Sequence, residues 1–224
     1  MSILNQIKGR LIVSCQALEN EPLHGAEIMR KMAKAAKEGG AVAIRANGVN
    51  DVIAIKDETQ LPVIGLIKRD YPNCDVYITP TIREIDELIH SGCEIIAMDA
   101  TNRCHPDRVT LKEKVERIHQ ASRLAMADIS TLEEAIQAQS LGFDIVSTTL
   151  SGYTPYSPQQ EAPDFQLIGE CVKNLSIPVI AEGRIFSVED IKAVKAQKPF
   201  AIVVGSAITR PQIITKRFND AYLE

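Results

Sequence analysis

Several polar side chains fall directly after short apolar runs, at the positions where buried strands would end. Six of them are Gln16, Arg45, Lys68, Asp99, Asp128 and Glu182, and the two other runs end at Ser147 to Thr149 and at Gly205 and Ser206. Any single polar strand end is explained as readily by the chain leaving the core. An amine, a guanidinium, an amide and three carboxylates on six different runs, however, are residue types used in acid–base chemistry. If parallel strands bring them to one edge, the set indicates a catalytic site.

Lys68 is the candidate base of this set, because it follows the apolar run VIGLI. Burial in a partly dry cavity lowers the pKa of an ammonium, so that the neutral amine becomes available to accept a proton. Nearby carboxylates such as Asp128 and Glu182 would raise that pKa, and the sequence does not decide which effect is larger. The alternative role of Lys68 is a simple ion pair with these carboxylates.

Two glycine-containing segments after the last two runs are candidates for binding a phosphate. The segment EGR covers residues 182–184, and VGSAITR covers residues 204–210. A backbone can approach an anion closely at glycine, and arginine adds a matching charge. Glycines that only relieve crowding at tight turns are the alternative. The predicted phosphate-binding residues are Gly183, Arg184, Gly205, Ser206 and Arg210.

A loop rich in Ser, Thr, Tyr and Pro, TTLSGYTPYSPQQ, follows the sixth run at residues 148–160. Its composition fits a lid over a polyhydroxyl ligand and a solvated loop equally well, and its position favours the lid. Thr149, Tyr153 and Thr154 are its candidate substrate contacts. Cys104 and His105 are adjacent, but two ligands in one loop without a third in register are poor evidence for zinc. No metal site is predicted.

Eight short runs rich in Val, Ile and Ala would position these residues, and stretches of helical period carrying Glu, Lys and Gln lie between them. The runs cover residues 10–16, 41–46, 63–68, 94–100, 124–129, 144–149, 179–183 and 201–206. Helix boundaries are also marked in the sequence. The predicted N-caps are Thr81, Thr110, Ser130 and Ser187, and the predicted C-terminal stops are Gly39, Gly92 and Gly142.

Runs that are apolar on nearly every residue indicate strands buried on both faces, as in a parallel sheet covered by helices. Eight such units in 224 residues match the lower part of the range for a (β/α)8 barrel. A doubly wound open sheet is the alternative, but its first turn is normally glycine-rich, and here that turn reads SCQALENEPLHG. No G-x-G-x-x-G or G-x-x-x-x-G-K follows any run, so no nucleotide cofactor is expected. We predict an α/β fold with one domain, a single (β/α)8 TIM barrel over residues 1–224.

The composition is that of an ordinary globular protein, with 45% hydrophobic and 24% charged residues, which excludes disorder, collagen and coiled coil. The longest uncharged apolar run, FAIVVGSAI, is about half the length of a membrane-spanning helix, so no membrane partner is expected. The N-terminus lacks a secretory signal pattern, and five scattered cysteines suit a reducing compartment, which together predict a cytoplasmic protein. We interpret the cysteines as packing residues. A net charge of −4 gives no reason to expect a nucleic-acid partner.

The fragments SCQALENEPLHG, GLIKRDYP, ADIST, STTLSGYT, AEGRI and VVGSAITRP occur in this order along the chain. In this arrangement the chain resembles the N-acetylmannosamine-6-phosphate 2-epimerases of bacterial sialic-acid catabolism over essentially its whole length. GLIKRDYP and TTLSGYT are specific, whereas AEGRI and VVGSAI occur more loosely across phosphate-binding barrels. The resemblance implies a catalytic lysine at Lys68, an acidic pair at Asp128 and Glu182, and substrate contacts at Gln16 and Arg45. It also implies phosphate loops at Gly183, Arg184, Gly205 and Arg210, and a homodimer.

The implied substrate is an amino-sugar phosphate, and the implied reaction inverts its carbon 2. In the open-chain sugar this carbon is next to an aldehyde, so its proton can leave to form an enolate without any redox cofactor or metal. Lys68 would remove the proton, Glu182 would supply one from the other face, and Asp128 would orient Lys68. Gln16 and Arg45 would hold the N-acetyl and hydroxyl groups or the oxyanion. A one-base scheme, in which Lys68 also returns the proton, stays open.

Two rival functions remain on the sequence alone. The first is another isomerase or an aldolase that acts on a different sugar phosphate, and a Schiff-base aldolase would also need a buried lysine. The second is a protein that binds sugar phosphates without catalysis. Such a protein would keep the glycine and arginine loops, but it has no need of Lys68, Asp128 and Glu182 together.

Overall fold

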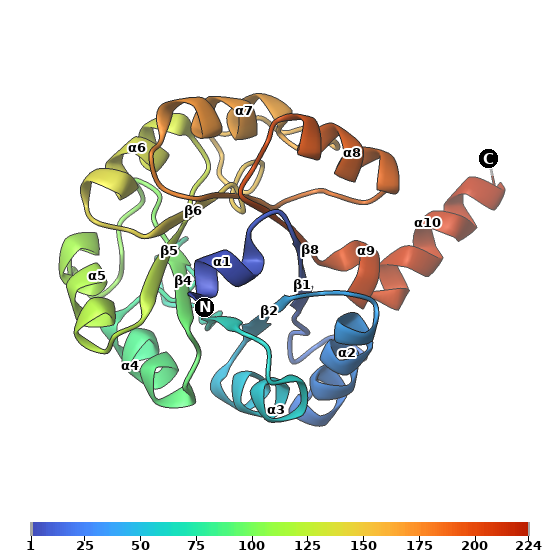
Figure 1. Cartoon of the computed structure of the whole chain (residues 1–224), viewed down its shortest axis with the longest axis horizontal. Helices are drawn as coiled ribbons and strands as arrows, with labels where there is room; N and C mark the ends of the chain where they lie inside the picture. The colour runs from blue at the N-terminus through green and yellow to red at the C-terminus, as the bar shows by residue number, and fades with distance from the viewer. Residues whose placement is uncertain (1, 224) are drawn as a thin grey trace.

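The computed structural model describes residues 2–223, and eight parallel strands within them form one closed barrel in chain order (Figure 1). The strands are β1 (Leu11–Cys15), β2 (Ala43–Asn47), β3 (Val63–Leu66), β4 (Ile95–Asp99), β5 (Leu124–Asp128), β6 (Ile145–Ser147), β7 (Val179–Ala181) and β8 (Ala201–Val204). The helices are α1 (Ile3–Ile7), α2 (Ala26–Glu38), α3 (Val49–Thr59), α4 (Ile82–Ser91), α5 (Leu111–Gln120), α6 (Leu132–Ser140), α7 (Phe165–Asn174), α8 (Val188–Ala196), α9 (Ser206–Thr209) and α10 (Pro211–Leu223). The predicted (β/α)8 fold is confirmed.

Strand residues alternate between two apolar clusters, because successive side chains of a strand point to opposite faces. One cluster fills the barrel interior and contains Ile12, Ala43, Ile64 and Met126. The other lies between the barrel and its helices and takes the neighbouring residues of the same strands. Each fully buried isoleucine in either cluster stabilises the fold by about 1.5–3 kcal/mol. This burial of both strand faces explains why the runs are apolar on nearly every residue.

Continuing the interior alternation to the strand ends selects the polar residues of the barrel mouth. On β1, Ile12 is followed on the same face by Ser14 and Gln16, and on β2, Ala43 is followed by Arg45. On the other six strands, every second residue after the interior ones gives the residue at the carboxyl end of the strand. These are Lys68, Asp99, Asp128, Thr149, Glu182 and Gly205. The interior face is therefore apolar at its amino end and polar at its carboxyl end.

The helix caps largely follow the sequence prediction, with one shift by a single residue. Thr81, Thr110 and Ser187 are N-caps whose side chains accept backbone N–H groups. The predicted N-cap Ser130 is wrong, because Thr131 caps α6 instead. Ser130 donates its backbone N–H and its hydroxyl to Glu134 Oε2, 2.8 Å away in both cases. The capping box of α6 thus begins one residue later than predicted, at Thr131.

The two chain ends behave differently (Figure 1). Helix α1 lies across the amino end of the barrel, where Ile7 packs into the interior cluster. Helix α10 projects away from the barrel and has no buried residue. No helix among residues 2–223 is long and apolar enough to span a membrane.

The interpretation of all five cysteines as packing residues is only partly right. Cys15, Cys93 and Cys171 are fully buried, whereas Cys104 is exposed and Cys74 is half-buried. The two exceptions lie in loops after β3 and β4, outside the layers that the helices cover.

Candidate active site

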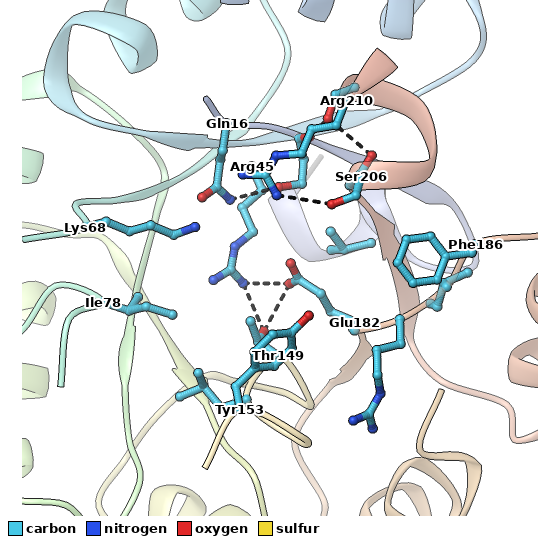
Figure 2. A pocket seen from close by; sticks show the side chains of 18 of the residues that line it. Gln16, Arg45, Lys68, Ile78, Thr149, Tyr153, Glu182, Phe186, Ser206 and Arg210 are labelled. Atoms are coloured by element: carbon cyan, nitrogen blue, oxygen red, sulfur yellow. Dashed lines mark hydrogen bonds and ion pairs between the residues drawn. The ribbon is translucent and has the colours of Figure 1, made fainter. Parts of the chain in front are cut away.

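A cavity opens at the carboxyl ends of the strands, and polar residues of six different strand ends contribute to it (Figure 2). Its lining includes Ser14, Gln16, Arg45, Lys68, Tyr77, Ile78, Thr149, Tyr153, Glu182, Gly183, Arg184, Phe186, Gly205, Ser206 and Arg210. Four of the lining side chains are basic and one is acidic. A cavity with this charge balance favours an anionic ligand.

Lys68 reaches into the cavity from a hairpin after β3. Its backbone pairs with Ile78 in an antiparallel bridge, and its backbone N–H donates to Asn47 Oδ1 at 2.8 Å. Within residues 2–223, its ammonium makes neither an ion pair nor a hydrogen bond, so the alternative role, an ion pair with Asp128 or Glu182, is not observed. Burial lowers the pKa of Lys68 to about 8, the cations Arg210 and Arg45 add to this effect, and Glu182 and Glu21 oppose it. Desolvation therefore outweighs the carboxylates.

Arg45 lies fully buried beneath the cavity and joins the two acidic residues of the prediction. Its Nη1 and Nη2 donate to Asp128 Oδ1 and Oδ2 at 2.9 and 2.5 Å. The same Nη1 donates to Glu182 Oε2 at 2.7 Å. Asp128, which we expected to orient Lys68, binds Arg45 and the Thr149 hydroxyl instead, at 2.8 Å from the latter. Asp128 does not line the cavity itself, and its hydrogen bonds connect it to the lining residues Arg45 and Thr149.

Glu182 follows β7 and is held by one of its two carboxylate oxygens. Oε2 accepts from Arg45 and lies 3.1 Å from the Thr149 hydroxyl, whereas Oε1 has no hydrogen-bond partner among residues 2–223. Burial raises the pKa of Glu182, and Asp128 adds to this, against the lowering effect of Arg45 and Lys68. Burial therefore favours the protonated form of this carboxyl group more than water does. Lys68 and Glu182 face the same cavity (Figure 2).

Gln16 is fixed at the end of β1 by Ser14, a residue that the sequence prediction missed. Its Nε2 donates to Ser14 Oγ at 2.8 Å, and its Oε1 is buried without a partner. Because an unpaired buried acceptor is costly, a ligand donor such as an amide N–H or a hydroxyl would complete it. Ser14 could have been predicted from its place two residues before Gln16 on the interior face of β1.

The loops after β7 and β8 form an anion-binding arrangement. Among the described residues, the backbone N–H groups of Gly183, Arg184, Gly205 and Ser206 donate no backbone hydrogen bond. Gly183 has a φ of 109°, a conformation that few other residues adopt. The Arg210 side chain adds a cation, held by Glu21 at 2.7 Å and by the Ser206 hydroxyl at 3.1 Å.

Three further predicted residues differ in their relation to the cavity. Tyr153 lines it and is about half exposed. Thr154 is buried inside its own loop, where its hydroxyl donates to Ser157 Oγ at 2.8 Å, and it does not line the cavity. Arg184 lines the cavity, but its guanidinium reaches towards the loop after β6. Side-chain direction within a loop has no signal in the sequence.

Tyr77 and Phe186 also line the cavity, although the sequence offered no strand end to mark them. Tyr77 lies on the hairpin that carries Lys68, and Phe186 follows the EGR segment. Asp99, by contrast, has the sequence signature of a mouth residue but does not line the cavity. Thr101 and Arg103, in the loop that follows β4, donate hydrogen bonds to the carboxylate oxygens of Asp99.

A closed (β/α)8 barrel with a cationic cavity at the carboxyl ends of its strands has the architecture of a barrel enzyme. Comparison with known proteins narrows this class. Residues 29–224 match the family described as "Putative N-acetylmannosamine-6-phosphate epimerase". The chain belongs to this family.

Relatives with the corresponding 2-epimerase name match almost end to end. One from Clostridium perfringens is 59% identical over 218 residues, which cover 97% of this chain and 99% of the relative. One from Clostridioides difficile is 60% identical over 219 residues, which cover 98% of each chain. The solved structure of the C. perfringens N-acetylmannosamine-6-phosphate 2-epimerase superimposes with a TM-score of 0.97 at 57% identity, covering 99% of this chain and 96% of that one.

A more distant structure shares the fold alone. The thiamine phosphate pyrophosphorylase from Pyrococcus furiosus has a TM-score of 0.63 at 16% identity, covering 93% of this chain and 90% of that chain.

Proposed function

We propose that this chain interconverts N-acetylmannosamine 6-phosphate and N-acetylglucosamine 6-phosphate by moving a proton at carbon 2. Family membership supports the substrate, and one observation carries the chemistry. Lys68 places an unpaired amine with a pKa of about 8 in a cavity that also holds Glu182 and the unbonded loop amides. An amine of this kind is partly neutral near neutral pH and can act as a base.

The phosphate anchors the substrate in this proposal. The backbone amides of Gly183, Arg184, Gly205 and Ser206 and the Arg210 side chain would receive it, because these residues line the cavity and their amides donate no backbone hydrogen bond among the described residues. Ser206 and Arg210 lie on the opposite side of the cavity from Tyr153 (Figure 2). A phosphate held there positions the remote carbon 2 for the chemical step. Gln16 Oε1 is a matching acceptor for the acetamido N–H or a hydroxyl.

Lys68 takes the proton from carbon 2 of the open-chain sugar, and the electron pair left behind forms an enolate with the neighbouring aldehyde. Arg45 stabilises the charge of the site and fixes Glu182 through its Nη1. Glu182, with a pKa raised by burial, is the candidate donor to the opposite face. Thr149 and Tyr153 complete the wall around the sugar.

A proton NMR time course with N-acetylmannosamine 6-phosphate in deuterated water tests this function. We expect the signals of N-acetylglucosamine 6-phosphate to appear, with solvent deuterium at carbon 2 of both epimers. Absence of conversion by the folded protein would refute the function. Borohydride trapping of Lys68 in the presence of the substrate would identify a Schiff-base aldolase instead.

The Glu182→Gln variant decides between two bases and one. In the two-base scheme it exchanges the carbon 2 proton but does not invert the centre. In the one-base scheme the variant still inverts carbon 2, and its rate changes only because the charge of Glu182 is lost. Asp190→Asn is a matched control, because Asp190 is a helix-capping carboxylate on the same side of the barrel, outside the cavity lining.

The proposal includes a homodimer. The projecting helix α10 carries the exposed apolar side chains Phe218, Tyr222 and Leu223, and an apolar groove lies nearby between α8 and α9 (Figure 1). Apolar surface of this kind is typical of a contact with another chain. Light scattering should give twice the chain mass of 24.6 kDa, and the double variant Phe218→Asp, Tyr222→Asp should give the monomer mass. A monomeric unmodified protein would refute the dimer.

We also propose that the protein acts in the cytoplasm. All five cysteines are free, which fits a reducing compartment. Cell fractionation of the producing organism, with antibodies against this chain, tests the location.

A further inference from the structure

Arg184 follows the phosphate-loop glycine Gly183, yet its side chain is engaged with a different loop. Its Nη1 donates to the Pro158 carbonyl at 3.4 Å, and its Nη2 donates to Ser151 Oγ at 3.3 Å. Both partners lie in the long connection between β6 and α7. The guanidinium therefore links the β7 loop to the β6 loop.

Gly152 shows how closely the guanidinium fits this loop. A Cβ atom built at Gly152 would lie 1.6 Å from Arg184 Nη1 and 2.7 Å from its Cζ. Gly152 also has a φ of 82°, which favours glycine independently. The guanidinium thus occupies the space that a side chain at this position would need.

The loop is also bound to its own helix, so that Arg184 acts on an ordered segment. Ser151 Oγ donates to Asp164 Oδ2 at 2.7 Å, and Asp164 Oδ1 caps α7 by accepting from the Leu167 N–H at 3.0 Å. The Gly152 N–H donates to Ser157 Oγ at 2.8 Å. Arg184 adds contacts to this ordered loop from outside it, at Ser151 and Pro158.

Tyr153 directly follows Gly152 and lines the cavity, although about half of it is exposed. In Figure 2, Tyr153 lies beside Thr149, on the side of the cavity away from Ser206 and Arg210. If phosphate is bound near Ser206 and Arg210, Tyr153 faces the other end of the substrate. Moving the Gly152 backbone would move this wall.

We infer that the Arg184 side chain is a positioning residue, which holds the β6–α7 loop so that Tyr153 closes the sugar end of the cavity. Its guanidinium does not bind the phosphate, and Arg210 supplies the cation for that group. The inference rests on the proposed function for its substrate. It assigns opposite tasks to two arginines that the sequence places in the same predicted phosphate site.

The test compares Arg184→Met, Arg184→Lys and Arg210→Met by three measurements. The first is the dissociation constant of inorganic phosphate, measured by calorimetry. We expect it to stay within about twofold in both Arg184 variants and to rise about tenfold in Arg210→Met, because only the latter loses a charged phosphate partner. Weakening of phosphate binding in Arg184→Met to the level of Arg210→Met would overturn the inference.

The second measurement is backbone hydrogen exchange over residues 148–164. Exchange should become faster in both Arg184 variants and stay unchanged in Arg210→Met, since lysine cannot reproduce the two-pronged contact of a guanidinium. Unchanged exchange in Arg184→Met would overturn the inference. Arg184→Lys retains the charge, so that it remains informative if Arg184→Met fails to fold.

The third measurement is the kinetics with N-acetylmannosamine 6-phosphate. In both Arg184 variants KM should rise about tenfold with a smaller change in kcat. The reason is that the ground state and the transition state lose the same contact with Tyr153. Full rescue of KM by Arg184→Lys would overturn the inference, since it would show that the charge alone matters. If the unmodified protein does not convert this sugar, the proposed function fails, while phosphate binding and hydrogen exchange still test Arg184.

Discussion

Two neighbouring strands of this barrel both end in an aspartate that does not itself line the cavity, and only one of these aspartates binds residues that do. Asp99 of β4 and Asp128 of β5 are register partners, and both are completely buried. Each binds an arginine, Arg103 and Arg45 respectively, at 2.5 Å. Asp99 and Asp128 therefore agree in residue type, burial, position on the strand and type of ion-pair partner.

The difference lies in where each arginine comes from and what else it contacts. Arg103 is four residues from Asp99 in the same loop, and its Nη1 donates to the Asp75 carbonyl at 3.1 Å. Arg45 comes from β2, across the barrel interior, and also binds Glu182 at 2.7 Å. The first pair stabilises a local loop, whereas the second pair connects three strand ends beneath the cavity. Only the second ion pair therefore contacts residues that line the cavity.

Removal of the two arginines should show the largest contrast. Arg45→Met should lower kcat/KM by about 10³-fold, and Arg103→Met by less than about threefold, because only Arg45 stabilises charge at the site. Arg45→Met leaves Asp128 and Glu182 without their cation and Arg103→Met leaves Asp99 without its cation, so each variant should lose at least about 3 kcal/mol of unfolding free energy. Steady-state kinetics and urea denaturation of both proteins measure this. Equal losses of kcat/KM would break the comparison.

The aspartates should show a smaller contrast. Asp128→Asn keeps the shape but weakens the hold on Arg45, and we expect kcat to fall about 10²-fold, against less than about threefold for Asp99→Asn. The measurement is kcat at saturating N-acetylmannosamine 6-phosphate. A drop in the Asp99 variant as large as that in the Asp128 variant would mean that Asp99 also acts on the cavity.

The pKa of Lys68 sharpens the comparison, because it can be measured both by kinetics and by a titration that needs no turnover. The neutral amine is the reactive form, so kcat/KM should rise with pH and level off above a pKa of about 8. Arg45 is one of the cations that lower this pKa, whereas Arg103 is not among its main causes. Carbon-13 NMR titration of labelled lysine should therefore show a higher pKa in Arg45→Met and the same pKa in Arg103→Met. A fall of the pKa in Arg45→Met would contradict the assignment.

The threonines beside the two pairs give the smallest effect. Thr149 lies 2.8 Å from Asp128 Oδ1, and Thr101 donates to Asp99 Oδ1 at 2.6 Å. Loss of one such hydrogen bond is worth about 1 kcal/mol, so Thr149→Val should lower kcat about fivefold. Thr101→Val should lower stability by a similar energy but leave kcat unchanged. A reduced kcat in Thr101→Val would count against the separation of the two pairs.

Much of this fold follows from the sequence, because double-sided burial makes the strands visible as apolar runs. The same pattern extends to the site, since alternate residues beyond each run reach the barrel mouth. This placed Gln16, Arg45, Lys68 and Glu182 at the cavity correctly.

The remaining features depend on side-chain direction and on contacts between loops. Asp99 and Asp128 have the same local sequence signature, and only the folded structure shows which arginine each one binds. Tyr77 lines the cavity because a hairpin folds back beside Lys68, and Arg184 turns towards the Gly152 loop. Neither strand periodicity nor glycine spacing contains this information.

Deuterium incorporation at carbon 2 by the Lys68→Ala variant is the most direct test of the central claim. Folded Lys68→Ala, incubated in deuterated water with N-acetylmannosamine 6-phosphate, should leave the carbon 2 proton signal intact over a time in which the unmodified protein replaces it completely. Exchange at the normal rate in this variant would contradict the assignment of Lys68 as the base.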